Sequence, residues 1–466
     1  MQSATEVTVK IKPVFEQLIH SGPYEGPCRV GKRGDLTTEA DEERGEAAAK
    51  EFFNDLEENL NEEVEILEPA FLKWKDDFVL REEELKKLEP DVRNADLVLI
   101  EGGLDQYPAV AIAERYDKPI GTLGWVTSVD ITASLRSKGM EGYAFLDYED
   151  LNKFITLLRT RKAFQNTKMM VCLEGDSFPS SGVVSSISDL ERLKKLYGVS
   201  HKFVSTHHFL EEMDQLSPAD KKEVEELTDA LIKGAEASHM DREDILPSVE
   251  FFVATRNLLD QYECNAFTIP CFEICARQVM EERKVMFCLT HSLLKDRGIP
   301  SACEADTNVL MAISLLTYLT DQSIYMGNSR GTDLRSNTLT VSHDVPGLKM
   351  QGLEEPDLPY EIRNFTVGGW GVTLRYDFSQ DVGEPVTLAR FNPDGDKLLV
   401  AKGEITGGQG FHEIGCSLGV DIELNDIADF FEKQQYFGHH MAIAYGNYVD
   451  LIHKVGKLMG FEVIES

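Results

Sequence analysis

The sequence predicts an α/β protein in which two doubly wound α/β domains are followed by an antiparallel, β-barrel-like domain. As far as Thr320, short apolar strands alternate with helices, a spacing typical of parallel sheets. Beyond Thr320, short strands follow one another without intervening helices, which is typical of a barrel or sandwich. At 466 residues the chain is too long for one ordinary core. We expect an N-terminal α/β domain over 1–165, a central α/β domain over 166–322 and a C-terminal β-rich domain over 323–466.

Composition excludes several classes of protein. Hydrophobic content of 42% and aromatic content of 9% predict a folded chain. The 47 basic and 81 acidic residues give a net charge of −34, which repels phosphate backbones and anionic membranes, so we expect neither nucleic acid nor membrane as a partner. The first residues lack a basic and then apolar signal, and the run Val309 to Thr320 is too short to span a membrane. We therefore expect a cytoplasmic protein.

The eight cysteines are scattered and form no C-x-x-C pair. They indicate neither a disulfide framework nor a structural zinc site, so we expect reduced and mostly buried thiols. Cys303 stands next to Glu304, but we interpret it as a small apolar residue that closes a buried strand rather than as a nucleophile.

The first section mixes solvated acidic helices with short strands. Its predicted elements are acidic helices over Thr38 to Leu67, a strand at Ala95 to Gly103, a helix at Tyr107 to Tyr116, a strand at Lys118 to Trp125 and a helix at Tyr148 to Phe164. Glu101-Gly-Gly follows the first strand but lacks the G-x-G-x-x-G spacing of a dinucleotide site.

The central section begins with a new strand at Thr167 to Gly175. The loop Asp176 to Gly182 either cradles a polar ligand or is an ordinary turn, since Ser, Pro and Gly serve both. His207 and His208 follow a predicted strand, where adjacent side chains point to opposite faces, so we expect no shared metal site there. Helices are predicted over Glu223 to Ala237, Ser248 to Tyr262, Cys271 to Arg283 and Leu289 to Arg297.

An acidic corner joins a short strand to an apolar helix within Pro300 to Thr320. Glu304 lies at this corner, where α/β proteins place chemistry at the carboxyl ends of strands. The helix over Val309 to Leu319 is apolar on nearly every face, so it should be deeply buried and hold the corner rigid. Alternatively, Glu304 and Asp306 only cap the helix.

The last section is predicted to be mostly strands. These are Ser323 to Asn328, Asn337 to His343, Ile362 to Phe378, Pro385 to Phe391, Lys397 to Glu404 and Gly415 to Leu424, followed by a turn at Phe437 to His440, a helix at Tyr448 to Met459 and a strand at Glu462 to Ile464.

Five pieces of sequence occur in an order that resembles the L-fucose/L-arabinose isomerase family. They are Gly298-Ile-Pro-Ser-Ala-Cys-Glu-Ala-Asp306 before an apolar helix, a strand that ends at Asn328, His343 within Thr340-Val-Ser-His-Asp-Val-Pro346, Lys402-Gly-Glu404, and Gly438-His439-His440 before a final helix and strand. The resemblance is strongest from Gly298 onward. The family includes isomerases for sulfoquinovose as well as for pentoses and 6-deoxyhexoses.

The resemblance implies a chain of two α/β domains and a barrel that assembles into a hexamer with active sites at subunit contacts. In such enzymes a divalent ion, typically manganese, holds an aldose while it is converted to a ketose. By position, Glu304 matches the metal-binding catalytic glutamate, His440 the C-terminal ligand, and His343 the histidine that the arabinose branch uses.

Asn328 departs from the family pattern, because it stands where the family has its second metal-binding carboxylate. An amide oxygen can coordinate a hard cation, but it brings no charge and accepts no proton at neutral pH. Isomerisation takes a proton from C2 and returns one at C1. We expect Glu304 to be the base, and Asp306, Asp333 or a metal-bound water to be the other proton carrier.

The expected metal set is Glu304, Asn328, His343 and His440, with His439 beside the substrate. Either histidine segment is alternatively an ordinary hydrogen-bonded histidine. Arg330 and Arg335 follow Asn328 closely, so they are candidates for binding an anionic substituent of the sugar. The alternative is that both pair with surface acids such as Asp321 or Asp333.

The sequence therefore predicts a metal-dependent aldose–ketose isomerase, an intramolecular oxidoreductase, for a pentose, a 6-deoxyhexose or a 6-substituted hexose such as a sulfonated one. The alternatives are a sugar-binding relative without turnover and a sugar epimerase, which uses the same enediolate.

Overall fold

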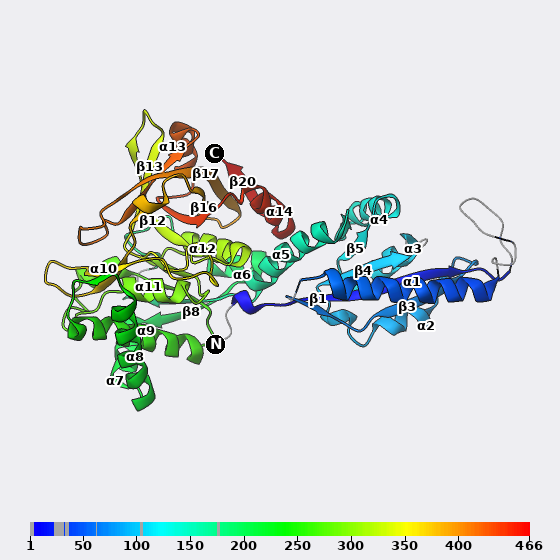
Figure 1. Cartoon of the computed structure of the whole chain (residues 1–466), viewed down its shortest axis with the longest axis horizontal. Helices are drawn as coiled ribbons and strands as arrows, with labels where there is room; N and C mark the ends of the chain where they lie inside the picture. Colours follow the sequence, from blue (N-terminus) through cyan, green and yellow to red (C-terminus); the bar gives the residue numbers. More distant parts are fainter. Residues whose placement is uncertain (1–3, 23–31, 33–36, 62, 103–105, 175–177) are drawn as a thin grey trace. The chain divides into compact units, whose positions relative to one another are not determined.

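The computed structural model describes all residues except 1–3, 23–31, 33–36, 62, 103–105 and 175–177. The chain forms two compact units, one over Val7–Arg159 and the other over 160–466 together with 1–6 (Figure 1). Both units mix helices and strands, and an antiparallel barrel lies near the C-terminus, which confirms the predicted α/β class and the change of character beyond Thr320. The predicted domain boundaries at 165 and 322 remain predictions.

The unit Val7–Arg159 is built on a parallel sheet of order β2-β1-β4-β5-β6, with β3 also paired to β1. Its elements are β1 (Val9–Ile19), α1 (Thr38–Asn59), β2 (Val64–Ile66), β3 (Ala70–Lys75), α2 (Glu82–Leu85), β4 (Leu97–Gly102), α3 (Gln106–Tyr116), β5 (Ile120–Leu123), α4 (Val126–Ser137), β6 (Gly142–Phe145) and α5 (Tyr148–Gln165), whose last turns belong to the other unit. β4 ends at the predicted glycine turn, of which Gly103 lies outside the described residues.

The other unit begins with a parallel sheet of order β11-β10-β7-β8. Its strands are β7 (Lys168–Leu173), β8 (Ser200–Ser205), β10 (Ala266–Ile269) and β11 (Ser301–Cys303). Its helices are α6 (Leu190–Tyr197), α7 (Thr206–Asp214), α8 (Pro218–Gly234), α9 (Arg242–Gln261), α10 (Cys271–Ala276), α11 (Cys288–Lys295) and α12 (Thr307–Thr320).

Two local details in this region differ from the prediction. His207 and His208 follow the strand β8 as predicted, but that strand ends at Ser205 and both histidines lie in the first turn of α7. The helix predicted over Cys271 to Arg283 ends at Ala276, where Gln278 adopts a left-handed φ of 58° that stops it.

A closed six-stranded antiparallel barrel follows α12. The strand order is β16-β19-β12-β13-β18-β17, and pairing of β16 with β17 closes it. The elements are β12 (Tyr325–Asp333), β13 (Thr338–Ser342), β16 (Pro385–Phe391), β17 (Lys397–Gln409), β18 (Gly419–Leu424), α13 (Ile427–Gln434) and β19 (His440–Tyr445), after which α14 (Val449–Met459) leads to β20 (Glu462–Glu465) on the side of β17.

The strand predicted over Ile362 to Phe378 is instead a separate hairpin. β14 (Glu361–Asn364) pairs with β15 (Val372–Arg375) on one side and with the two-residue β9 (Ala237–Ser238) on the other, outside the barrel. The turn Phe365 to Gly371 divides the two strands, and two of its glycines have positive φ, which requires a residue without a side chain.

Alternation along the barrel strands sorts residues into two sets. Tyr325, Val341 and Ile443 belong to the buried apolar cluster inside the barrel. Asn328, Ser342 and His440 have the opposite parity and face outward, and the register places Asn328 opposite both of the others. The sheet therefore brings together three polar residues that are far apart in sequence.

Among the helices that the structure describes, none has the length and apolar character needed to cross a membrane.

Candidate metal centre

Glu304 lies at a strained corner between β11 and α12. Its φ is 60° and that of Ala305 is 50°, and each left-handed residue costs about 1–2 kcal/mol when it carries a side chain. The corner is held because the Ala305 N–H donates to Ile269 O and the Asp306 N–H donates to Cys303 O. Strain of this kind is concentrated at functional sites, and here it orients a carboxylate whose side chain is only 18% exposed.

Asp306 caps the buried helix α12. Its Oδ1 accepts hydrogen bonds from the backbone N–H groups of Asn308 and Val309, at 3.0 and 3.1 Å. All of α12 from Thr307 to Leu319 is buried, as its apolar sequence predicted. The capping interpretation therefore holds for Asp306, and the corner is attached to a rigid element.

The other carboxylate oxygen of Asp306 serves two buried partners. Oδ2 accepts a hydrogen bond from Arg390 Nη1 at 2.6 Å and one from His440 Nδ1 at 2.8 Å, and all three side chains are fully buried. Burial raises the pKa of Asp306, but the charges and hydrogen bonds of Arg390 and His440 lower it by more than burial raises it. The pKa is therefore far below its usual range. Asp306 is therefore a carboxylate with every oxygen occupied.

His440 is oriented by this carboxylate. Because Nδ1 donates to Asp306, the lone pair of a neutral ring is on Nε2, 3.8 Å from Glu304 Oε2. Nε2 is buried and has no hydrogen-bond partner among the described residues. Burial lowers the pKa of His440, which keeps the ring neutral. A histidine held by a carboxylate behind it is the usual arrangement of a metal ligand.

His439 completes a group of three possible ligands. Its ring centroid lies 4.3 Å from that of His440, and burial, together with His440 and Arg390, lowers its pKa to about 4. One ligand atom each from Glu304, His439 and His440 lies within 4.8 Å of the others. One carboxylate and two neutral imidazoles suit a divalent transition metal.

His343 contacts the same carboxylate, that of Glu304, through its ring nitrogen Nε2. Its Nε2 lies 3.3 Å from Glu304 Oε1, and its Nδ1 accepts the Asp344 N–H at 3.2 Å. Burial lowers the pKa of His343, but Cys416 and Glu304 raise it well above its usual value. Burial likewise raises the pKa of Glu304, and the neighbouring histidines lower it more. Because Nδ1 accepts a hydrogen bond, the ring proton is on Nε2, and the Glu304 carboxylate accepts a hydrogen bond from it.

The remaining predicted residues lie along β12. Asn328 is half-buried and opposite His440 in the register, and Arg330, on the same face, donates to Ser342 Oγ at 3.2 Å. Asp333 and Arg335 lie at the exposed hairpin tip, roughly 15 Å further along the strand by its rise per residue. The structure therefore places Asn328 opposite His440 but leaves Asp333 and Arg335 at the far end of the hairpin.

Glu273 is a buried carboxylate that the sequence interpretation missed. Its Oε1 accepts hydrogen bonds from Ser180 Oγ, Ser181 N and Ser181 Oγ at 2.7, 2.5 and 2.8 Å. A side chain at Gly182 would approach Glu304 Oε2 to 3.3 Å, so this loop closes one side of the corner. Glu273 follows β10 in the sequence as Glu304 follows the neighbouring strand β11. This shared position after a predicted strand is the sequence feature from which Glu273 could have been found. Of the predicted loop Asp176 to Gly182, Asp176 and Ser177 lie outside the described residues.

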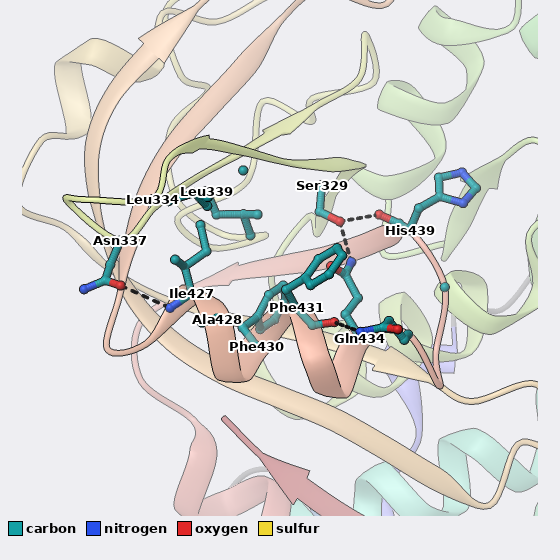
Figure 2. A pocket seen from close by; sticks show the side chains of 13 residues that line it. Ser329, Leu334, Asn337, Leu339, Ile427, Ala428, Phe430, Phe431, Gln434 and His439 are labelled. Carbon is teal, nitrogen blue, oxygen red and sulfur yellow. Dashed lines mark hydrogen bonds between the residues drawn. The ribbon is translucent and has the colours of Figure 1, made fainter.

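A cavity of about 700 Å³ lies on the inner side of β12, between the β12–β13 hairpin and α13 (Figure 2). Apolar side chains such as Leu339, Ile427 and Phe430 line it, together with Ser329, whose Oγ donates to His439 O at 2.7 Å. Figure 2 shows the His439 ring directed away from these residues. Of the three possible metal ligands, His439 also belongs to the cavity lining.

No family model matches the chain, and no curated protein matches it either.

Proposed function

We propose that the chain is a metal-dependent aldose–ketose isomerase related to the L-fucose/L-arabinose isomerases. The observation that carries the proposal is the group Glu304, His439 and His440, whose ligand atoms lie within 4.8 Å of one another. The order of residues that resembles the family supports the same reaction, and a homo-oligomer, a hexamer by that resemblance, is part of the proposal.

The donor set fits a divalent metal. The buried Nε2 of His440 has no hydrogen-bond partner in the described part of the chain, and a buried polar atom without one is costly. Ligation by Glu304, His439 and His440 would remove that cost, with Asn328 as a further oxygen donor opposite His440. A bound Mn²⁺ would act as a Lewis acid that stabilises the negative charge of an enediolate.

The proton chemistry belongs to two side chains in contact. Glu304 is ionised and can accept the C2 proton, and its strained corner fixes its direction. His343, whose Nε2 lies 3.3 Å from Glu304 Oε1, is a candidate for the second proton carrier. Asp306 is unsuited to that role, because its two oxygens already accept four hydrogen bonds, and we assign it to positioning His440.

Two alternatives keep the same site. The neutral Asn328, in place of an acid, favours a sugar-binding protein without turnover. An epimerase would use the same base and return the proton to the carbon that it left.

The test is isotope exchange in deuterated water. Protein loaded with Mn²⁺ is incubated with a pentose, a 6-deoxyhexose and a 6-sulfonated hexose, and the sugars are analysed by mass spectrometry and NMR. Deuterium in a ketose supports the isomerase, deuterium in an epimeric aldose identifies an epimerase, and binding without label identifies a binding protein.

The matched variants are Glu304→Gln, which removes the proposed base, and Glu423→Gln, which removes an exposed barrel carboxylate. Exchange should be lost in the first and kept in the second. Exchange that survives in Glu304→Gln, or after complete chelation of metal, would refute the proposal.

A further inference from the structure

Cys271 and Cys303 bring two thiols together beside the acidic corner. Cys303 ends β11 and is paired in the sheet with Ile269, which ends β10. Cys271 lies two residues after Ile269 and is the first residue of α10. Their Sγ atoms are 2.9 Å apart, and both cysteines are free. A disulfide bond is about 2.05 Å long, so the sulfurs need to approach by only about 0.9 Å.

We propose that Cys271 and Cys303 are a covalent modification site, a dithiol that a hydroperoxide oxidises to a disulfide. The two residues differ in access, as this chemistry requires. Cys271 is partly exposed, whereas Cys303 is 1% exposed. Cys271 therefore meets the oxidant, and Cys303 is the resolving thiol behind it.

The reaction has two balanced steps. In the first, Cys271 Sγ attacks the hydroperoxide, an S–O bond forms, the O–O bond breaks, and water or an alcohol leaves. In the second, Cys303 Sγ attacks the resulting sulfenic acid, the S–S bond forms, the S–O bond breaks, and water leaves. The two thiols lose two electrons and two protons, and the hydroperoxide takes them up.

The bond would join two sides of the site. Cys303 directly precedes Glu304, whose left-handed backbone depends on the β11 end, and Cys271 is two residues before Glu273. Drawing the sulfurs together pulls on both segments. Oxidation should therefore change the affinity of the corner for a divalent metal, and reduction should restore it.

Cys275 supplies the matched control. It lies on the same short helix and is more exposed, but its Sγ contacts Met286 Sδ at 3.7 Å rather than a second cysteine. If exposure alone decided which thiol is oxidised, Cys275 would react. If the short distance between Cys271 and Cys303 decides, the disulfide forms without Cys275.

The test is peptide mapping of the full chain after treatment with hydrogen peroxide, with free thiols alkylated before digestion. Trypsin should release Cys271 in the peptide 257–277 and Cys303 in the peptide 298–330. A linked pair of these peptides, lighter by two hydrogens than their sum and split by a reductant, is expected. The peptide 257–277 also contains Cys264 and Cys275. In Cys275→Ser, fragment spectra of the linked peptides show whether the bond is at Cys264 or at Cys271.

Cys271→Ser and Cys303→Ala should each lose the link, and Cys275→Ser should keep it. The proposal is overturned if Cys275→Ser gives no linked peptides, or if Cys303→Ala forms the same amount of intramolecular link as the parent. The readout is a mass and needs no turnover, so it stands apart from the proposed isomerase activity.

Discussion

Asp306 Oδ2 accepts a hydrogen bond from His440 Nδ1 at 2.8 Å, across 134 positions of sequence. This contact fixes the tautomer in which Nε2 carries the lone pair that faces Glu304. The same oxygen accepts from Arg390 Nη1, and Oδ1 caps α12. One carboxylate therefore joins the helix after the acidic corner to the barrel strand that carries the histidine.

Asp306→Asn should damage both the proposed metal site and the fold. The Asn amide can still cap α12, but its NH₂ group then faces Arg390 and His440, two donors. His440 should change tautomer and lose its Nε2 lone pair, lowering metal affinity about 10–100-fold. The unpaired Arg390 charge should cost about 3–5 kcal/mol of unfolding free energy.

Calorimetric metal titration and urea denaturation measure the two effects. Asp333→Asn is the control, since Asp333 is exposed and accepts hydrogen bonds from Arg335 N and Ser336 Oγ of its own hairpin. It should change stability by less than about 0.5 kcal/mol. Metal affinity equal to that of the parent in Asp306→Asn would show that His440 is not a ligand.

Local pattern explains why much of the fold was predictable. The strand Pro385–Phe391 and the helix after the acidic corner have unbroken hydrophobic patterns, and both lie where the sequence predicted. β1 was missed because Lys12, Pro13 and Glu16 interrupt its apolar pattern. The side chains of Lys12 and Glu16 are both buried and have partners distant in sequence, since Lys12 pairs with Asp91 and Glu16 accepts a hydrogen bond from Trp74. Such long-range partners leave no periodic signal.

The site was predictable in its residues but not in its assembly. Glu304 and the two histidines were identified, but His440 was placed in a turn, whereas it begins β19. Its pairing with Asn328 arises from the β12–β19 register, which neither segment specifies alone. The saturation of Asp306 likewise depends on Arg390, 84 residues away. The sequence predicted which residues could be metal ligands. Contacts between distant segments of the folded chain determine which of those residues keep a lone pair that no hydrogen bond uses.

Asn328→Asp should tighten metal binding. The half-buried residue 328 is opposite His440, and a carboxylate there adds charge and a better oxygen ligand for a hard cation. We expect roughly tenfold higher affinity for Mn²⁺, since ligand charge sets affinity at such sites. Asn447→Asp makes the same charge change at an exposed position and should have no effect. An unchanged or weaker affinity in Asn328→Asp would place residue 328 outside the ligand shell.

Lys295 should make stability depend on pH. Its Nζ is buried and donates to the carbonyl oxygens of Ile324 and Val345, and burial lowers its pKa to about 7, although Asp296 raises it. An unfolded lysine has a pKa of about 10.4. Between these values the unfolded chain holds the proton and the folded chain has released it. The unfolding free energy therefore rises with pH there, by up to about 1.4 kcal/mol per unit.

In Lys295→Met, the rise of unfolding free energy with pH should be lost, whatever the stability of the variant at neutral pH. Urea denaturation at about pH 7 and about pH 9 measures the difference between the variants. Lys222→Met is the control, since Lys222 is exposed and its partner Glu226 lies on the same helix. A slope in Lys295→Met equal to that of the parent would show that Lys295 stays charged in the folded state.

Arg330 and Arg335 should differ in their effect on an anionic sugar. Arg330 lies two residues beyond Asn328 on the same face of β12, about 7 Å along the strand, and donates to Ser342 Oγ next to His343. Arg335 lies at the exposed hairpin tip and is the matched control. If the substrate carries a sulfonate or similar group, Arg330→Ala removes a charged hydrogen bond of about 1.5–3 kcal/mol. The ratio of kcat/KM for a 6-sulfonated hexose to that for a 6-deoxyhexose should then fall about 10–100-fold in Arg330→Ala and stay constant in Arg335→Ala. A parent protein that prefers the neutral sugar would contradict the anionic substrate, and the guanidinium of Arg330 would then serve only to hold Ser342.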